Sequence, residues 1–568
     1  MMLVKEWLYP PAKPVDNASF HSLQESLGDD RWLAPVLWQR GLSSIEEVRR
    51  FFQGPALDFL FPWQLIDMDK AVDRLELAFQ RKEQITVFGD YDVDGTTSVA
   101  VVSTFLRSAG FSVVTYIPDR STEGYGLGMP GVEAAVQAGS SVLIALDCGI
   151  KSHKEIAHAH QLGLDCIVCD HHTPDAQLPP AVAIINAKRS DDTHPFKDFS
   201  ACGVGFLLCL ALADRRKMPT ENLWSLIDLV AISIGADMVP LVGLNRSLVL
   251  EGLRQMNRSP RPAVKALLAN RKRSSIDLKD VVFAIAPRIN AAGRMAHGHL
   301  AVELLTASTD EQVEVLRQAI ESHNDKRRST DQVIFGEAAK EAKQYLSSAG
   351  MVVHQPHWHK GVVGIVAQRL VESFYKPTVV LTTSKGVLAG SARSVEGFDL
   401  YAALEACSAH LLQFGGHRAA AGMTLLPEKL LDFRAAFDEY CEMTLTPDQR
   451  HPVQRVDALV SLRELTDRSA SLLERMAPFG VGNEEVVLGV TGIQLLWPKA
   501  VGPQGDHLKV VLHDCTDGTR LSGIGFRMGS WANTPLDALC RVAFTLEFNE
   551  FNGKRSLQAH IVDLQLQQ

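Results

Sequence analysis

Short apolar runs alternate with amphipathic, helix-length segments along the first half of the chain. The apolar runs predict strands at residues 85–88, 113–117, 141–146, 166–169 and 183–185. Segments of helical length lie beside them, at residues 67–80, 131–138 and 154–162. This alternation of strand and helix is typical of an α/β domain built on a mostly parallel sheet.

The second half of the chain changes pattern twice. Residues 309–346 lack proline, and Ser308 with Glu311 predicts a capping box, so we expect a linking helix of about 35 residues, ~50 Å long. Five alternating strand runs then predict an OB-like β-barrel, at residues 486–493, 507–513, 519–526, 541–550 and 555–562. The predicted domains are a helical cap on the catalytic core (1–65), an α/β catalytic domain (66–308), the linking helix (309–346), a second α/β domain (349–448) and the barrel (449–568).

Three aspartates, Asp90, Asp92 and Asp94, follow the first predicted strand at alternate positions. On an extended chain alternate side chains point to one side, and we expect the helix to begin only at Thr96, after Gly95. Three carboxylates this close repel one another, so a divalent cation is their natural counter-ion. A solvated acidic turn that caps the next helix is the alternative.

Further acidic residues and histidines follow later apolar runs. Asp147 follows the third predicted strand, Asp170, His171 and His172 follow the fourth, and Asp237 ends a longer apolar run. Because the carboxyl ends of parallel strands lie at one edge of a sheet, we expect these side chains to converge, although any one of them could be a helix cap. Carboxylates with one or two imidazoles suit Mn²⁺ or Mg²⁺, and a pair of such ions supports metal-assisted phosphoester hydrolysis.

Composition narrows the class of protein. A net charge of -9 argues against a protein that coats duplex DNA without specificity, but it leaves room for a confined basic groove. The nine cysteines lack the paired spacing of a zinc site, and the chain has no apolar run of about 18 residues. We therefore expect a cytoplasmic protein with reduced thiols and no membrane association.

Residues 92–94, Asp147, residues 170–172 and Asp237, in this order, resemble the four motifs of the DHH phosphoesterase superfamily. Four further runs resemble the RecJ family of single-strand-specific 5′→3′ DNA exonucleases, at residues 88–95, 123–127, 286–295 and 415–422. The resemblance extends from about residue 70 to the end of the sequence. It implies a DHH catalytic domain, a DHHA1-type second domain and a monomeric enzyme that degrades single-stranded DNA to mononucleotides in DNA repair and recombination, fed by a helicase and a single-strand-binding protein.

The resemblance also implies a ligand set. It assigns one cation to Asp94, Asp147, His171 and Asp237, and a second to Asp90, Asp92 and Asp147, which bridges the two. His172 would face away from His171, because adjacent residues of an extended chain point to opposite sides, and would contact the scissile phosphate or the leaving oxygen. Asp170 would orient a histidine. Phe88 stands where some members of the superfamily have a histidine ligand, so the second site is short of a nitrogen donor.

Substrate contacts are expected outside the metal site. Residues 286–295 predict a Gly/Ala-rich turn that brings Arg288, Asn290 and Arg294 to phosphate, with a purely structural loop as the alternative. By resemblance, the terminal 5′-phosphate is assigned to Arg120, Ser391 and Arg393, and the nucleic-acid end also to His417 in its glycine-rich run. On the barrel, we expect stacking or charge contacts from Phe526, Arg527, Phe548, Phe551, Lys554 and Arg555.

Two rival functions stay open at this point. One is a phosphodiesterase of the same superfamily that acts on cyclic dinucleotides or very short RNA, which would have little use for a barrel domain. The other is an inactive DNA-binding scaffold, whose signature would be lost carboxylates, whereas the expected carboxylates are present.

Overall fold

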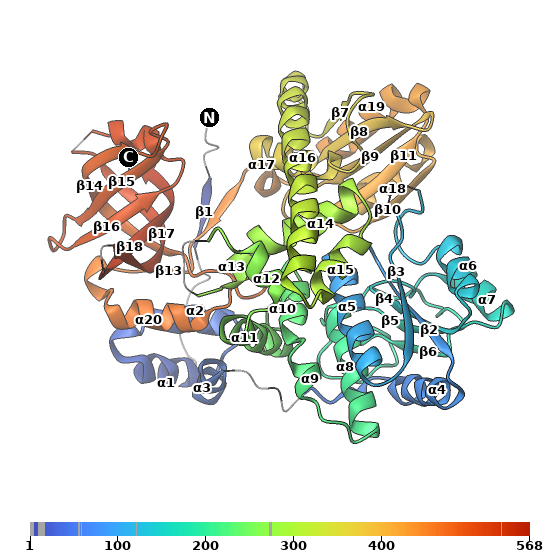
Figure 1. Ribbon diagram of the computed structural model, residues 1–568. Helices are drawn as coiled ribbons and strands as arrows, with labels where there is room; N and C mark the ends of the chain where they lie inside the picture. Colours follow the sequence, from blue (N-terminus) through green and yellow to red (C-terminus); the bar gives the residue numbers. More distant parts are fainter. Residues whose placement is uncertain are drawn as a thin grey trace. The chain divides into compact units, whose positions relative to one another are not determined.

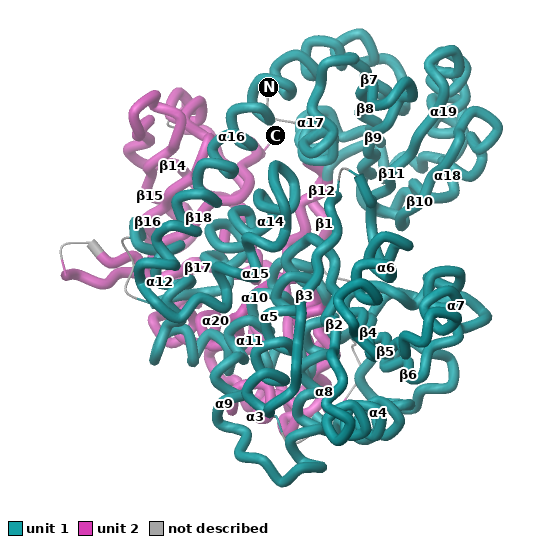
Figure 2. Tube along the Cα trace, turned by 45° about the vertical axis from the view of Figure 1, so that its right-hand side comes forward, with its two compact units in different colours: residues 1–4, 57–239, 243–452 teal, residues 5–56, 240–242, 453–568 magenta. Residues whose placement is uncertain are grey.

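The computed structural model describes residues 5–9, 18–54, 57, 60–120, 122–271, 275–535, 537–551 and 553–567. The described chain forms two compact units (Figures 1 and 2). The first unit comprises residues 57–239 and 243–452, and the second comprises residues 5–56, 240–242 and 453–568. No helix in the described part of the chain has the length and apolar character of a membrane span.

A five-stranded parallel sheet forms the core of the first unit. Its strand order is β3-β2-β4-β5-β6, and every neighbouring pair is parallel. The strands are β2 (Gln84–Gly89), β3 (Ser112–Tyr116), β4 (Ser140–Leu146), β5 (Asp165–Cys169) and β6 (Ala183–Ile185). The five predicted strands and the parallel sheet are therefore confirmed.

Helices cover this sheet and extend beyond it (Figure 1). They are α4 (Met68–Arg81), α5 (Val93–Ser108), α6 (Met129–Gln137), α7 (His153–Gln161), α8 (Ala201–Arg215), α9 (Glu221–Trp224), α10 (Ile227–Asp237), α11 (Gly243–Arg258), α12 (Pro262–Leu267), α13 (Leu278–Asp280), α14 (Ala286–Met295) and α15 (His299–Thr306). A π-helical turn, Val281–Ile285, leads into α14.

Two expectations for this region are wrong. Helix α5 begins at Val93 rather than Thr96, because the Asp92 side chain caps it by accepting a hydrogen bond from the Gly95 N–H. Residues 286–295 form helix α14 rather than a turn, with Pro287 in its first turn, a position where the missing N–H costs nothing. The alanines of this run favour helix more than its single glycine opposes it.

The predicted linking helix is α16 (Asp310–Ala342), a single helix of 33 residues. Its N-cap is Thr309, whose hydroxyl accepts a hydrogen bond from the Gln312 N–H at 3.3 Å. The cap therefore lies one residue beyond the predicted Ser308, because Thr309 is the last residue with an extended backbone.

A second, mixed sheet follows α16, in the order β10-β11-β9-β8-β7, with only β7 and β8 parallel. Its strands are β7 (Met351–His354), β8 (Thr378–Ser384), β9 (Val387–Arg393), β10 (Gln413–Gly416) and β11 (Ala420–Leu425). Its helices are α17 (Val363–Phe374), α18 (Leu400–Ala406) and α19 (Leu430–Thr444). This is the predicted second α/β domain.

The second unit contains the predicted barrel. Strands β14, β15, β16, β18 and β17 pair in that order, and β14 pairs with β17, which closes the barrel and removes its edges. Their bounds are β14 (Leu488–Val501), β15 (His507–Asp514), β16 (Arg520–Gly525), β17 (Leu539–Phe551) and β18 (Lys554–Leu566). The flanking elements are β1 (Glu6–Leu8), β12 (Val453–Arg455), β13 (Ala458–Leu459) and α20 (Asp467–Met476).

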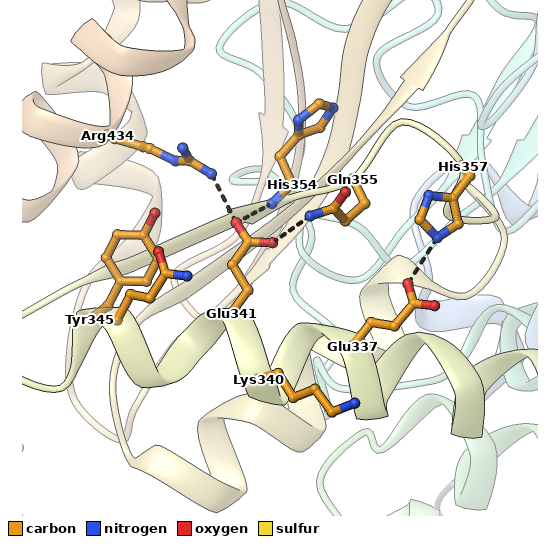
Figure 3. Close-up of a pocket in the computed structure, with 9 residues that line it drawn as sticks. Glu337, Lys340, Glu341, Tyr345, His354, Gln355, His357 and Arg434 are labelled. Carbon is orange, nitrogen blue, oxygen red and sulfur yellow. Dashed lines mark hydrogen bonds and ion pairs between the residues drawn. The ribbon is translucent and has the colours of Figure 1, made fainter.

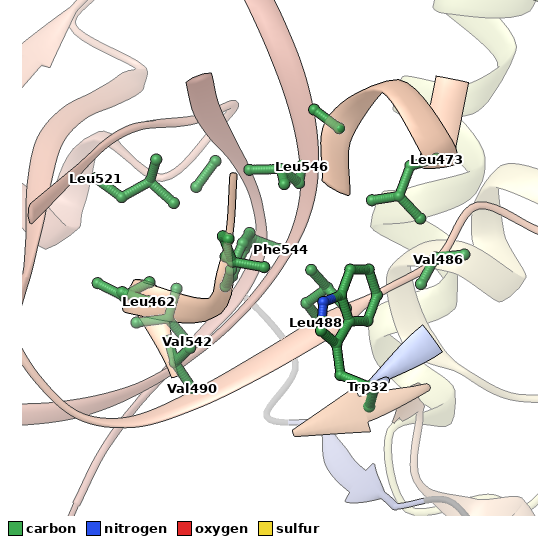
Figure 4. Packing of buried hydrophobic residues seen from close by; sticks show 14 of the residues in the cluster. Trp32, Leu462, Leu473, Val486, Leu488, Val490, Leu521, Val542, Phe544 and Leu546 are labelled. Atoms are coloured by element: carbon green, nitrogen blue, oxygen red, sulfur yellow. The ribbon is translucent and has the colours of Figure 1, made fainter. Parts of the chain in front are cut away.

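The N-terminal helices share their core with the barrel. Helices α1 (Ala18–Leu27), α2 (Leu33–Gln39) and α3 (Ile45–Gln53) contribute to the hydrophobic cluster that fills this unit. Figure 4 shows Trp32 beside Leu488 of strand β14. The expectation that these helices pack on the catalytic core is therefore wrong: their buried side chains pack against the barrel.

Candidate active site

The polar residues that follow the parallel strands converge at one edge of the sheet. The register pairs Gly89 with Leu146 and Leu146 with Cys169, so β2, β4 and β5 end together. Three sets of side chains there have donor atoms within 4.8 Å of one another: Asp90, Asp92 and Asp147; Asp94, His171 and Asp237; Asp147, His171 and His172. Asp237 comes from the end of helix α10, so the apolar run before it is a helix rather than a strand.

Helix α8 and a serine hold the Asp94 carboxylate. Its oxygens accept hydrogen bonds from the backbone N–H groups of Ala201 and Cys202, at 2.8 and 2.9 Å, where helix α8 begins. The Ser233 hydroxyl donates a third, at 2.7 Å. These donors fix the direction of the carboxylate, and one of its oxygens lies 3.7 Å from Nε2 of His171.

The remaining carboxylates repel one another. Burial and then the charge of neighbouring aspartates raise the pKa of Asp147, Asp237 and Asp90 well above the usual range of a carboxyl. Burial also lowers the pKa of His171, which keeps its imidazole neutral and able to coordinate a cation. Both ring nitrogens of His171 and one oxygen of Asp90 are buried without a hydrogen-bond partner within the described structure. Cations at this edge would satisfy Nε2 of His171, the ring nitrogen that faces the carboxylates, and the orphaned oxygen of Asp90. Oxygen donors with one imidazole fit Mn²⁺ or Mg²⁺.

His172 is held by Asp170. Its Nδ1–H donates to Asp170 Oδ1 at 2.7 Å, and the same oxygen accepts the backbone N–H groups of His171 and His172. Although burial opposes it, the hydrogen bond to His172 lowers the pKa of Asp170 to about 2, and the pKa of His172 is raised in return. This is the arrangement that an orienting role for Asp170 requires.

The two histidines do not face opposite sides. Their rings lie 4.6 Å apart, and His171 Nε2 and His172 Nδ1 are 3.2 and 3.9 Å from the same oxygen of Asp147. The expectation of opposite directions is therefore wrong, because the chain has left strand β5 at Cys169 and no longer follows the alternation of a strand. Phe88 is fully buried and stacks on Tyr116, so it supplies no donor, as expected.

A cluster of arginines lies in the same unit. Burial, and then the charges of three other arginines, lower the pKa of Arg294 to about 9. These three are Arg120 after strand β3, Arg393 on strand β9 and Arg327 on helix α16. Like charges gathered from four segments indicate an anion-binding site.

The other predicted substrate residues lie on helix α14 and strand β9, and some of them are hydrogen-bonded or ion-paired within the protein. Arg288 pairs with Glu321 of helix α16 at 2.7 Å, which fastens α14 to α16. Asn290 lies one helical turn before Arg294 on α14, on the same face. On strand β9, Arg393 donates to the Ser391 hydroxyl at 2.8 Å.

His417, from the second sheet, lies beside the side chains of the three sets above, which together form the candidate metal-ligand cluster. Its ring is nearly parallel to that of His172, with centroids 6.4 Å apart. Gly416 before it has a φ of 145°, and a Cβ there would lie 2.4 Å from the Ala420 carbonyl oxygen. Only glycine therefore allows the tight turn, closed by the His417 N–H bond to Ala420, that presents this ring.

Two residues at this site carried no role in the sequence interpretation. Arg327 belongs to the basic run 326–328 of helix α16, and a run of charges on a helix is typical of a solvated face. Tyr125 stands between two glycines, and its hydroxyl lies 2.9 Å from His172 Nε2. The Gly-Tyr-Gly spacing was the available signal, since flanking glycines allow a loop to project a side chain.

A polar pocket of about 660 Å³ lies elsewhere, between the end of α16 and the second sheet. Glu341 accepts hydrogen bonds there from the His354 N–H, Gln355 and Arg434, at 3.1, 3.2 and 3.0 Å (Figure 3). None of the predicted site residues lines it. These contacts pin α16 to the second domain.

Three stretches of the chain match the models of known protein families. Residues 84–234 match the model of the DHH family N-terminal domain, residues 342–443 that of the DHHA1 domain, and residues 456–563 that of the RecJ OB domain.

Relatives that match nearly the whole of this chain are single-stranded-DNA-specific exonucleases. The chain is 34% identical to single-stranded-DNA-specific exonuclease RecJ of Bacillus subtilis, over 99% of this chain and 71% of that one, and 35% identical to its Escherichia coli counterpart, over 91% and 93%. It is also similar to the crystal structure of Thermus thermophilus RecJ in complex with Mn²⁺, at 28% identity and a TM-score of 0.82, over 99% of this chain and 79% of that one. The chain therefore belongs to the RecJ family of single-stranded-DNA-specific exonucleases, within the DHH family.

Proposed function

We propose that this protein degrades single-stranded DNA from its 5′ end, releasing mononucleotides, with two divalent cations at the active site. The observation that carries the proposal is the pair of ligand groups at the sheet edge, which a third group connects by sharing Asp147 with one and His171 with the other. These groups lie in the same compact unit as the arginine cluster. The family gives the substrate, and the geometry supports the number of cations and the direction.

Each of two ligand groups would hold one cation. Asp94, His171 and Asp237 would hold one cation, and Asp90, Asp92 and Asp147 the other. Asp147 lies 3.2 Å from His171 and so belongs to the surroundings of both. Bound there, the cations would supply Lewis-acid activation of water and neutralise charge on the scissile phosphate.

His172 would act on the phosphodiester. Asp170 holds its Nδ1–H, so the other ring nitrogen, Nε2, which faces the Tyr125 hydroxyl at 2.9 Å, is the one that would contact a phosphate or leaving oxygen. His417, stacked above it, is placed to approach the same phosphate from the second domain.

The arginine cluster would set the direction of degradation. Arg120, Arg294, Arg327 and Arg393 offer several cationic donors, and a terminal 5′-phosphate carries more charge than any phosphate within the chain. Only a free end brings such a group into the cluster, so hydrolysis would start at the 5′ end.

The barrel would also bind single-stranded DNA. The register pairs Lys499 with Lys509 across β14 and β15, and continues through Ile524 to His560, so these side chains share one outward face. Phe526 is 52% exposed, and its ring meets those of His507 and His560 edge-on, with centroids 5.1 Å apart in each pair.

Trp497 lies at a bulge of β14, 67% exposed, with the Arg520 guanidinium 5.6 Å from its ring. Exposed rings among cations suit stacking of bases. Of the predicted barrel residues, Arg555 instead pairs with Glu474 at 3.0 Å, and the side chain of Phe551 lies outside the described residues.

The test is degradation of a 5′-phosphorylated strand labelled at its 3′ end, with Mn²⁺ or Mg²⁺, beside the same strand in a duplex. The labelled strand should shorten from its 5′ end only when single-stranded, and a 5′-labelled strand should release its label as a mononucleotide. Asp147→Asn should abolish the activity, and Asp432→Asn on the exposed side of α19 should leave it unchanged. A wild type that binds the strand and leaves it whole with both metals would favour the scaffold alternative.

A short-substrate phosphodiesterase would instead prefer dinucleotides to long oligomers in the same assay. We also propose that the enzyme acts in the cytoplasm with a helicase and a single-strand-binding protein. The relatives compared are bacterial, and the nine cysteines are free thiols, in keeping with a reducing compartment.

A further inference from the structure

The loop between strand β3 and helix α6 is built to present one tyrosine. Glu123 anchors it by accepting hydrogen bonds from the Tyr116 hydroxyl at 2.9 Å and the Asp119 N–H at 2.7 Å. Gly124 and Gly126 have φ values of 91° and 82°, which L side chains rarely adopt. The Gly126 N–H also donates to Asp90, which ties the loop to the metal-ligand cluster.

Tyr125, between these glycines, has an exposed ring and a hydroxyl group that points into the site. The residue is 59% exposed, so much of its ring is open to solvent. Its hydroxyl nevertheless points inward, 2.9 Å from Nε2 of His172 and 3.4 Å from the carbonyl oxygen of Asp147. Because Nδ1–H of His172 is held by Asp170, the hydroxyl fixes the other end of the imidazole.

Tyr125 also belongs to a row of rings. Its ring meets that of Tyr91 edge-on at 6.4 Å and that of His172 at 5.9 Å. The guanidinium of Arg120 lies 5.0 Å from the Tyr91 ring centroid. The row therefore runs from the arginine cluster to His172.

We propose that Tyr125 is a positioning residue for the leaving nucleotide. In our proposed function, the arginine cluster binds the terminal phosphate and His172 contacts the scissile one, so the nucleoside between these phosphates lies along the row of rings. The Tyr125 ring forms one wall for that deoxynucleoside. Its hydroxyl keeps His172 aimed at the scissile phosphate. The inference rests on the proposed function and adds the residue that places the terminal nucleoside against it.

Two substitutions separate the hydroxyl from the ring. Tyr125→Phe keeps the wall and loses the bond to His172, so kcat on a 5′-phosphorylated oligomer should fall about 10-fold with KM nearly unchanged, as expected for one hydrogen bond to an ionisable partner. Tyr125→Ala also removes the wall, so KM should rise about 10-fold in addition, as expected for the loss of one stacking surface. Tyr401→Phe, on the exposed side of α18, is the matched control.

Mn²⁺ affinity, measured by calorimetry on the full chain, provides the readout that a merely structural role would change. It should stay within about 2-fold of wild type in both variants. The inference is overturned if both variants keep wild-type kcat and KM, or if both lose Mn²⁺ binding, since the loop would then support the metal ligands rather than the nucleotide. Failure of the proposed function looks different, because the wild type itself would then not degrade the strand.

Discussion

Asp147→Asn should make the metal-free protein more stable at neutral pH. Asp147 is buried, and burial followed by the charges of Asp92 and Asp94 raises its pKa. A carboxyl whose pKa is higher in the folded state stabilises the fold fully below its unfolded pKa of about 3.9, and this contribution is lost as pH rises toward the folded value. Asparagine carries no charge, and it tolerates the left-handed backbone of this position, where φ is 61°.

The magnitude follows from proton linkage. While the folded state keeps one proton that the unfolded state has lost, the free energy of unfolding of the wild type falls by about 1.4 kcal/mol per pH unit relative to the variant. The two proteins should therefore be similarly stable near pH 4 and diverge above it. Asp170 and the other acidic groups are common to both, so their contributions largely cancel in the difference.

Urea unfolding in EDTA from pH 4 to pH 8, followed by circular dichroism, measures this difference. Adding Mn²⁺ at 100 times its dissociation constant should stabilise the wild type by about 2.7 kcal/mol and the variant much less, because a ligand of the cation is missing. Asp432→Asn should follow the wild type throughout. A difference that does not change with pH, or a variant that is less stable than wild type in EDTA at pH 7, would refute the reasoning.

Three further outcomes are expected. Ser233→Ala removes a buried donor to Asp94, so it should lower the free energy of unfolding in urea by about 1.5–3 kcal/mol and weaken Mn²⁺ binding in calorimetry; unchanged values would mean that Asp94 needs no such support. Gly364→Ala places a Cβ 3.1 Å from Arg393 and Ser391, so competition assays should show less preference for 5′-phosphate over 5′-hydroxyl ends. Trp497→Ala should weaken binding of long single strands about 10-fold by fluorescence anisotropy, without changing dinucleotide hydrolysis; an equal loss for both substrates would contradict a stacking role on the barrel.

The local order of strands, helices and ligands could be predicted from the sequence. Buried parallel strands are short apolar runs, so β2, β4 and β5 were recognisable, and the residues just after them had to lie at one edge of the sheet. The acidic and histidine motifs therefore predicted most of the side chains that the structure brings together as candidate metal ligands. The long helix and the barrel strands were also predictable, because a helix and a strand each repeat their apolar residues with a characteristic period.

Tertiary packing decided the features that depend on contacts between segments far apart in the sequence. An amphipathic helix shows which of its faces is buried but not what covers that face, so the pairing of helices α1 to α3 with the barrel could not be predicted. The direction of His172 followed from the turn after β5, and the arginine cluster from four segments brought together in space. Strand ends are fixed by local pattern, whereas side-chain directions in turns and contacts between distant segments are fixed only when the whole chain packs.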